Sequence, residues 1–196
     1  LKYGYYIADT IPPNIQNIFI YKSLKENFFK KVKIELTRKK NLYSLNDTIE
    51  ITGILGFGYS GYDRQNSSYN RNGIYKRDLI INGKSVFSYK FDDLTFQDGK
   101  KIDLLIDYKS YNIDKIRIKK LYQNINSKFS FLENGDNYGL FNVVEDSLYN
   151  IKIIFEDINK NKSIVSVIIK GSKNENRFDF SESDIENKLY YPDLEY

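Results

Sequence analysis

The sequence predicts a mostly β protein: an antiparallel, immunoglobulin-like β-sandwich that carries an inserted helix-containing segment. Three observations lead to this fold class. Several short segments alternate apolar and polar residues, which is typical of strands with one buried face. Tyr and Phe, which favour strands, supply 18 and 13 of the 196 residues. Turn-forming residues separate the segments at short intervals, as in sandwiches and barrels.

The first half of the chain contains most of the expected strands. Pro12 and Pro13 cannot donate ladder hydrogen bonds, so they mark a strand entry or a sheet edge. Asn82-Gly83 matches the two-residue turn of a β-hairpin. We expect strands over residues 15–21, 32–36, 48–56, 74–81 and 84–91.

Glycine alternates with aromatic residues in the segment 56–63. A phosphate-binding P-loop would end in Gly-Lys-Ser/Thr and continue into a helix, and neither feature follows here. We interpret the segment as a strand that bends or bulges where another backbone approaches closely.

The second half of the chain is less regular. Residues 97–100 read as a turn, and residues 102–108 as a strand or a short helix. A helix is expected over residues 110–124, because its apolar residues fall near one face and its basic residues turn to water. Further strands are expected over residues 140–144, 147–155 and 163–170.

A tyrosine follows an acidic turn shortly before the last two strands. Tyr149 comes after Glu145 and Asp146, in the way that a tyrosine corner precedes the penultimate strand of an immunoglobulin-like domain. We expect the apolar residues of the alternating segments to form the core: Ile18, Ile20, Ile49, Ile51, Leu55, Leu79, Ile81, Phe87, Ile151, Ile153, Phe155, Val165, Val167 and Ile169.

These segments predict one domain over residues 1–171, with the insertion at about residues 95–145. Beyond Gly171 the alternation stops, so residues 172–196 are interpreted as a tail or as the truncated start of a further segment. The chain contains no Met, which suggests an excised piece of a longer protein or a processed product.

The chain contains no His and no Cys. This excludes Ser-His-Asp and Cys-His triads, imidazole zinc sites and disulfides within the chain. We therefore predict no catalytic residue, no metal site and no cofactor. Two alternatives stay open: carboxylate catalysis by Asp92-Asp93 or Asp103/Asp107, and calcium binding by Asp157-Ile158-Asn159 or by residues 134–137. Adjacent Asp residues in a strand face opposite ways, and the EF-hand pattern is missing.

Charge and hydropathy argue against two classes of partner, nucleic acids and the membrane interior. The 30 basic and 26 acidic residues are interspersed and leave a net charge of +4, so we do not expect a nucleic-acid partner. No apolar run approaches the ~20 residues of a membrane-spanning helix, so no transmembrane segment is expected.

One segment, residues 57–75, has the composition of a glycan-binding loop. Flat aromatic faces stack on sugar rings, while Asp and Arg side chains hydrogen-bond to hydroxyl groups. The alternative is that these tyrosines cover the edge of the sandwich. The candidate ligand-binding residues are Tyr59, Tyr62, Asp63, Arg64, Tyr69, Arg71 and Tyr75.

Several strings of residues, in order along the chain, resemble one known domain. They are Asp9-Thr10-Ile11-Pro12-Pro13-Asn14-Ile15, Gly56-Phe57-Gly58 with Tyr62-Asp63, Asn70-Arg71-Asn72-Gly73-Ile74-Tyr75, Asn82-Gly83-Lys84-Ser85-Val86-Phe87-Ser88-Tyr89 and Ile106-Asp107-Tyr108. Residues 5–171 thereby resemble the C-terminal, non-catalytic β-domain of Bacteroidota M23 (LytM-type) peptidoglycan metallopeptidases.

The resemblance implies a function without chemistry of its own. The zinc-binding histidines of M23 enzymes have no counterpart here, because the chain has no histidine. The resemblance also implies a periplasmic or outer-membrane-associated location in the cell envelope. The implied partners are the catalytic domain of the parent protein, another envelope protein or peptidoglycan. We therefore expect an accessory domain that positions or regulates a wall endopeptidase; the alternative is a glycan- or peptidoglycan-binding module that uses residues 57–75.

Overall fold

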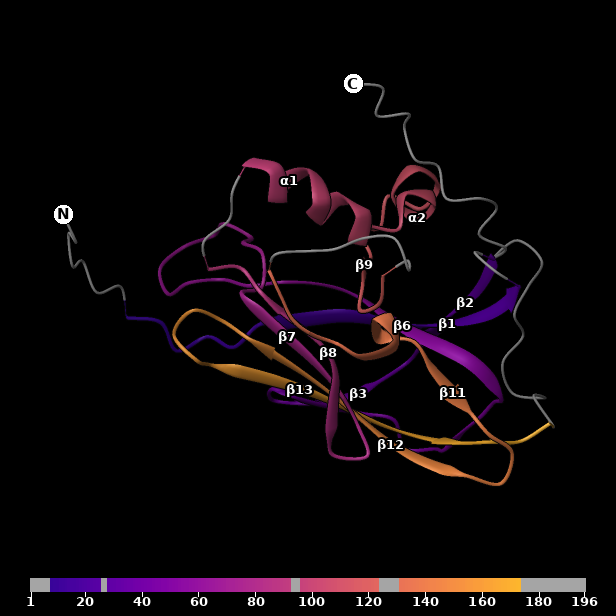
Figure 1. The fold of residues 1–196 in the computed structure, drawn as a ribbon. Coiled ribbons are helices and arrows are strands. Elements are labelled where there is room, and N and C mark those ends of the chain that lie inside the picture. Colours follow the sequence, from indigo (N-terminus) through magenta and orange to yellow (C-terminus); the bar gives the residue numbers. More distant parts are fainter. Residues whose placement is uncertain (1–7, 26–27, 93–95, 124–130, 174–196) are drawn as a thin grey trace, which may run out of the picture.

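The computed structural model describes residues 8–25, 28–92, 96–123 and 131–173, and within them the chain forms two β-sheets (Figure 1). The smaller sheet has the strand order β11-β6-β1-β2, and β9 pairs with β6. Its strands are β1 (Asn14–Lys25), β2 (Phe28–Ile34), β6 (Gly53–Tyr62), β9 (Lys119–Lys120) and β11 (Phe141–Val143).

The larger sheet has the order β10-β8-β7-β12-β13-β4-β3, and β5 pairs with β13. Its strands are β3 (Thr37–Lys39), β4 (Leu42–Ser44), β5 (Ile49–Glu50), β7 (Lys76–Ile81), β8 (Lys84–Lys90), β10 (Leu132–Gly135), β12 (Leu148–Glu156) and β13 (Lys162–Lys170). The pairing is antiparallel except that β13 runs parallel to β4 and β5. The predicted mostly β, two-sheet architecture is confirmed.

The core lies between the two sheets. Every residue that the sequence predicted for the core is buried there, because strand alternation turns one side of each strand inward. Ile18 and Ile20 of β1 belong to the same hydrophobic cluster as Ile153 and Val165 of the larger sheet. Burying an aliphatic or aromatic side chain of this size stabilises the fold by ~1.5–3 kcal/mol relative to its exposed state.

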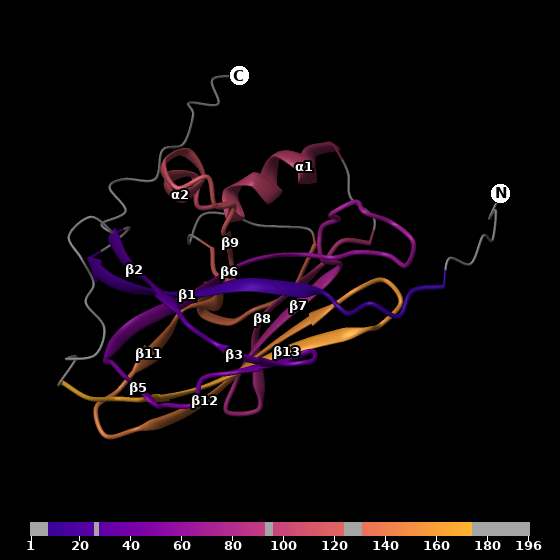
Figure 2. The same ribbon diagram turned by 180° about the vertical axis from the view of Figure 1, so that it is seen from behind.

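A second hydrophobic cluster covers the other face of the smaller sheet. Phe19 and Tyr21 alternate with the core residues of β1 and pack instead against Phe29, Ile118 and Tyr122. The helices α1 (Phe96–Ile102) and α2 (Tyr108–Ile113) lie on this side of the molecule, away from β12 and β13 (Figure 2). The segment around them therefore forms a third layer.

The glycines of β6 make this layer fit. A Cβ atom on Gly56 would lie 2.6 Å from the Tyr122 ring, and one on Gly58 would lie 2.8 Å from the Tyr21 ring. At Gly61, a Cβ atom would lie 2.7 Å from the Asn14 carbonyl oxygen, next to a register shift between β1 and β6. The predicted close approach and bulge are confirmed.

Two predicted turns have the expected geometry. Asn82 and Gly83 join β7 to β8, and both have positive φ angles, 49° and 84°, as the two-residue hairpin turn requires. The Tyr149 hydroxyl donates to the Asn142 carbonyl oxygen (3.3 Å) and accepts from the Val144 N–H (3.2 Å). Tyr149 thus ties β12 back to the preceding turn; the immunoglobulin-like topology itself stays a prediction.

The predicted helix over residues 110–124 is present only up to Ile113, and its later part is wrong. Helix α2 begins two residues earlier, at Tyr108, because the Asp107 carboxylate caps it by accepting a 3.0 Å hydrogen bond from the Ser110 N–H, and it ends at Ile113. The chain then becomes extended and forms β9 on β6. The predicted turn over residues 97–100 is also wrong, because these residues lie in α1.

The segment 102–108 combines a 3-10 helix, Asp103–Leu105, with an isolated bridge between Ile106 and Lys119. The later strands of the proposed insertion, residues 95–145, are part of the sandwich itself. Strand β10 pairs with β8 in the larger sheet, and β11 pairs with β6 in the smaller sheet. Of the proposed tail, residues 174–196 lie outside the described part of the chain.

Candidate functional site

Two neighbouring surface cavities lie where the end of β6 meets the segment after α2. One has a volume of about 340 Å³ and is lined by Arg71, Arg117 and Lys119 together with Tyr62 and Tyr89. The other, about 300 Å³, shares Tyr62, Arg71 and Arg117 with it. We call this surface, defined by Tyr62, Arg71, Arg117 and Lys119, the cationic groove. Among the described residues, none that lines either cavity is acidic.

The loop after β6 brings Arg71 to Tyr62. Asp63 and Asn72 close this loop with two backbone hydrogen bonds, 3.0 and 2.9 Å long. The Arg71 guanidinium carbon consequently lies 4.7 Å from the centroid of the Tyr62 ring, and that of Arg64 lies 5.3 Å away. Stacked on the ring, the Arg71 guanidinium is held at the groove and keeps its hydrogen-bond donors for a ligand.

The segment after α2 supplies the opposite side of the groove. The Asp107 N–H donates to the Ile118 carbonyl oxygen (3.0 Å), and Lys119 pairs with Tyr59 of β6. Ile118 is buried, so its neighbours Arg117 and Lys119 point away from the cluster around Phe19 and Tyr21. Strand alternation therefore aims both cations at the cavity.

The electrostatic field at the groove is positive. The Tyr59 phenol raises the pKa of Lys119, but burial and the charges of Arg77 and Arg117 outweigh it, and the pKa lies below its ordinary value. Burial is the larger of the lowering causes, and the positive charges of Arg77 and Arg117 add to it.

A buried cation lies behind the cavity wall. Arg77 has no exposed surface, and its guanidinium carbon is 4.9 Å from the Tyr89 ring centroid and 4.6 Å from that of Phe91. Its Nε donates a 2.6 Å hydrogen bond to the Tyr59 hydroxyl. Since Tyr89 and Phe91 also line the cavity, Arg77 adds to its positive field.

The structure brings together only part of the candidate set from residues 57–75. Tyr62, Arg64 and Arg71 lie in contact, as described. Tyr59 is buried in the core, and Asp63 is buried below the loop.

Tyr69 and Tyr75 lie outside the groove. Tyr69 is 94% exposed, and the Tyr75 hydroxyl donates to Asp92 at the opposite end of the loop region. Sequence reasoning missed Arg117 and Lys119; the alternation of Ile116 and Ile118 with these cations is the signal that predicts a strand there.

Of the two carboxylate pairs that were weighed for catalysis, the structure describes both members only for Asp103 and Asp107. Asp107 is buried and caps α2, while Asp103 is exposed. Asp92 forms an ion pair with Lys90 (2.7 Å), and Asp93 lies outside the described residues.

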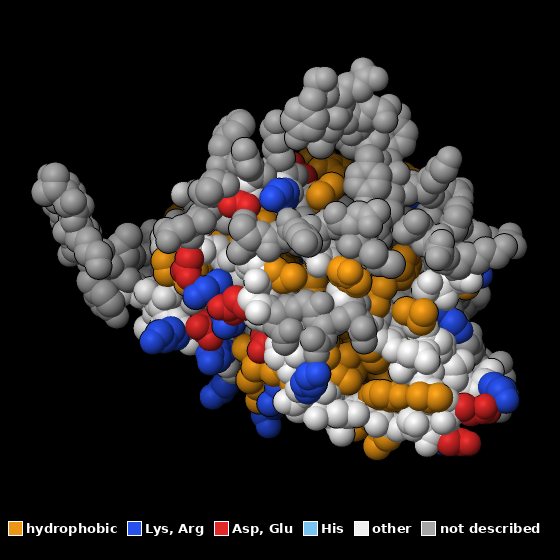
Figure 3. All heavy atoms as spheres, in the orientation of Figure 1, with side chains coloured by type: hydrophobic (Ala, Val, Ile, Leu, Met, Phe, Trp, Pro, Cys, Tyr) orange, Lys and Arg blue, Asp and Glu red, His pale blue; other side chains and the backbone are white. Residues whose placement is uncertain are grey.

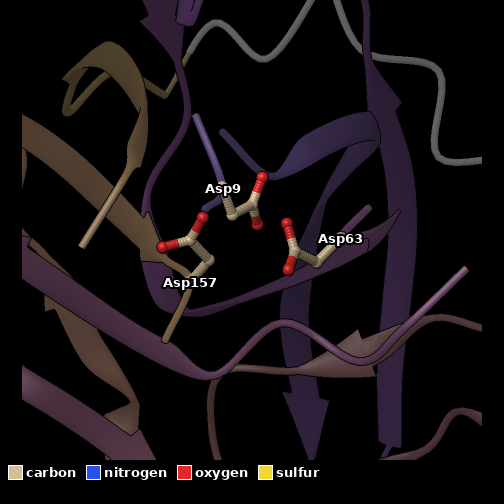
Figure 4. A group of neighbouring side chains, drawn as sticks. All are labelled: Asp9, Asp63 and Asp157. Carbon is tan, nitrogen blue, oxygen red and sulfur yellow. The ribbon is translucent and has the colours of Figure 1, made fainter. Parts of the chain in front are cut away.

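Three other carboxylates converge from distant parts of the sequence. Asp9, Asp63 and Asp157 each place a carboxylate oxygen within 4.8 Å of the others, and each side chain is buried (Figure 4). The sequence offered Asp157 and Asn159 as one alternative for a calcium site. In the structure, the Asp157 carboxylate accepts hydrogen bonds from Asn161. The side chains of residues 134–137, the other calcium alternative, lie outside the described part of the structure.

The surface carries charges of both signs. On the face drawn in Figure 3, Lys and Arg side chains lie next to Asp and Glu side chains, with hydrophobic side chains between them. Among the helices of the described residues, none has the length and apolarity to cross a bilayer.

Comparison with models of protein families, with curated proteins and with solved structures finds no match to this chain. The fold and the groove define a mostly β, two-sheet protein with a cation-lined surface cavity.

Proposed function

We propose that this chain is a non-catalytic accessory domain of an M23-type cell-wall endopeptidase and that it binds a carboxylate-bearing peptidoglycan fragment in the cationic groove. The observation that carries the proposal is the cavity lined by Arg71, Arg117 and Lys119 beside the aromatic side chains of Tyr62 and Tyr89. Its volume of about 340 Å³ lies in the range of small-ligand sites.

The chemistry of the groove fits such a ligand. Peptidoglycan joins sugar rings to short peptides that carry free carboxylates. A guanidinium binds a carboxylate through two parallel hydrogen bonds, and these charge-assisted bonds are about twice as strong as neutral ones. The accessible part of the half-buried Tyr62 side chain offers apolar surface to a sugar ring. Arg71 and Arg117 would hold the peptide carboxylate, and Tyr62 would contact the sugar.

Two observations support a binding role without catalysis. The chain lacks the histidines of the M23 zinc site. Asp9, Asp63 and Asp157 are close together but only 1–6% exposed, which leaves a sugar chain no access to them. A paired-carboxylate glycosidase needs its two groups roughly 5–9.5 Å apart across an open cleft.

The link to an M23 enzyme of the envelope comes from the sequence resemblance over residues 5–171. Within such an enzyme, a binding domain would raise the local concentration of wall substrate at the tethered catalytic domain. The same surface would position the enzyme on the wall.

Isothermal titration calorimetry with a soluble disaccharide-peptide from peptidoglycan tests the proposal. We expect one site per chain, no binding of the same disaccharide without its peptide, and roughly 10–100-fold weaker binding by Arg71→Ala and Arg117→Ala, since each removes a charged hydrogen-bond donor. Lys170→Ala, which removes an exposed cation from β13, should bind like the wild type.

If no fragment gave a heat of binding, the proposal that the chain binds peptidoglycan would be overturned. If the M23 catalytic domain were bound instead, and with equal affinity by Arg71→Ala, the accessory role would stand and the groove would be excluded as its surface.

A further inference from the structure

The three buried carboxylates lie where both sheets meet the N-terminal segment. Asp9 precedes β1, Asp63 follows β6 of the smaller sheet, and Asp157 follows β12 of the larger sheet. Their exposed fractions are 6%, 6% and 1%. Figure 4 shows Asp9 between the other two, with the carboxylates of Asp9 and Asp63 turned toward one another.

Two carboxylate oxygens of this cluster lack a hydrogen-bond partner within the described part of the chain. Asp9 Oδ1 accepts from the Ile11 N–H (3.0 Å), but its Oδ2 has no hydrogen-bond partner among the described residues. Asp63 Oδ1 is likewise buried without a partner in the described part of the chain. A buried, unpartnered carboxylate oxygen is costly, so such an arrangement calls for a bound group.

The third carboxylate is held rigidly. Asp157 Oδ1 accepts from the Asn161 N–H (2.8 Å), and its Oδ2 accepts from the Asn161 side-chain amide (2.7 Å). The same amide also donates to the Asp9 carbonyl oxygen (3.0 Å). Asn161 therefore fixes Asp9 against Asp157, and each bonded oxygen keeps a second lone pair for a ligand.

The three close carboxylates also call for a group that neutralises their charge. Like charges this close in a dry site repel one another unless a proton or a metal ion neutralises them.

We propose that Asp9, Asp63 and Asp157 form a calcium-binding site that joins the N-terminal segment to both sheets. Ca²⁺ prefers oxygen ligands at 2.3–2.6 Å, so ligand atoms on opposite sides of the ion lie ~4.8 Å apart, the spacing within which these oxygens fall. All the proposed ligand atoms are carboxylate oxygens, which favour hard cations such as Ca²⁺ over soft metals. Mg²⁺ needs shorter bonds and retains several waters, for which a cluster this buried is poorly suited.

The site has a structural consequence for the groove. Asp63 directly follows Tyr62, and its backbone closes the loop that carries Arg71. Bound calcium would fix the base of this loop and stabilise the native state, since the unfolded chain cannot bring residues 9, 63 and 157 together.

Thermal unfolding of the full chain, after EDTA treatment and then with added Ca²⁺, tests the proposal, and calorimetry gives the stoichiometry. We expect one Ca²⁺ per chain and a rise in Tm of about 5–10 °C at 100-fold excess over Kd. Mg²⁺ at the same concentration should raise Tm by less than half as much.

The Asp63→Asn variant separates a metal site from a packing role. In EDTA this variant should unfold at a higher temperature than the wild type. The substitution removes one of three buried negative charges, and among the described residues Asp63 Oδ1 makes no hydrogen bond that could be lost. The variant should also lose the calcium response, whereas Asp114→Asn, which changes an exposed carboxylate, should keep it.

The proposal is overturned if about 10 mM Ca²⁺, above the Kd of extracellular calcium modules, leaves Tm unchanged. It is equally overturned if Asp63→Asn keeps the full calcium response, or if Mg²⁺ acts as strongly as Ca²⁺.

Discussion

The Tyr21 hydroxyl donates a 2.8 Å hydrogen bond to Asp107 Oδ2, and this bond joins the sandwich to the segment that completes the groove. Tyr21 lies on β1, whereas Asp107 is the N-cap of α2. Lys31 of β2 adds an ion pair to the same oxygen (3.4 Å). Since Arg117 and Lys119 follow α2, their position depends on this buried junction.

The junction predicts a pH dependence of stability. Burial alone would raise the pKa of Asp107, but hydrogen bonds from Ser110 and Tyr21 and the charge of Lys31 outweigh it and hold the pKa below its ordinary value. A lowered native pKa stabilises the fold above the unfolded pKa of ~3.9 and loses this effect as pH falls through the native value.

Asp107→Asn should therefore lower the free energy of unfolding by ~1–3 kcal/mol at neutral pH, and the difference should shrink below about pH 4. Urea unfolding at a series of pH values measures both. The exposed Asp103→Asn, in the preceding turn, is the matched control and should match the wild type throughout. A constant difference at all pH values would contradict the assigned role of the Asp107 charge.

The fully buried position of Arg77 beside the rings of Tyr89 and Phe91 predicts that stability depends strongly on this side chain. Arg77→Ala removes the hydrogen bond to Tyr59, the contacts with Tyr89 and Phe91, and a large buried volume. We expect a loss of ~3–5 kcal/mol in urea unfolding, as for other large-to-Ala changes in cores. Arg77→Met, which keeps most of the volume, should cost less. Equal costs for both variants would show that packing volume is irrelevant at this position.

The glycines of β6 predict a contrast between two similar substitutions. Gly58→Ala should destabilise by ~1–3 kcal/mol, because its Cβ atom would lie 2.8 Å from the Tyr21 ring and 3.0 Å from Ile118. Gly73→Ala should be neutral or slightly stabilising, since nothing lies within 4 Å of its Cβ position. Thermal unfolding of the two variants measures the difference, and equal Tm values would contradict the close packing of this layer.

The sandwich could be predicted because its strands follow a two-residue period. Ile151, Ile153 and Phe155 illustrate this: their spacing alone places them on the buried face. The helix over residues 110–124 could not be placed correctly in this way. Ile113 and Ile116 fit a helical face, but they are 67% and 36% exposed, because the Asp107 cap and the β9–β6 pairing determine the local structure.

The site depends on contacts that no local pattern records. Asp9, Asp63 and Asp157 are separated by long stretches of chain, and only the packing of the two sheets brings them within 4.8 Å. Tyr59 shows the opposite error, because its neighbours in sequence suggested a ligand contact while the strand turns its ring into the core.

The most direct test of the proposed function is an NMR titration of the ¹⁵N-labelled chain with the peptidoglycan disaccharide-peptide. The proposal predicts saturable shifts of backbone amides at Tyr62, Arg71, Arg117 and Lys119, with the strands β12 and β13 unaffected, and no shifts in an Arg71→Ala, Arg117→Ala double variant. An unchanged spectrum of the wild-type chain at saturating ligand, or shifts confined to another surface, would contradict it.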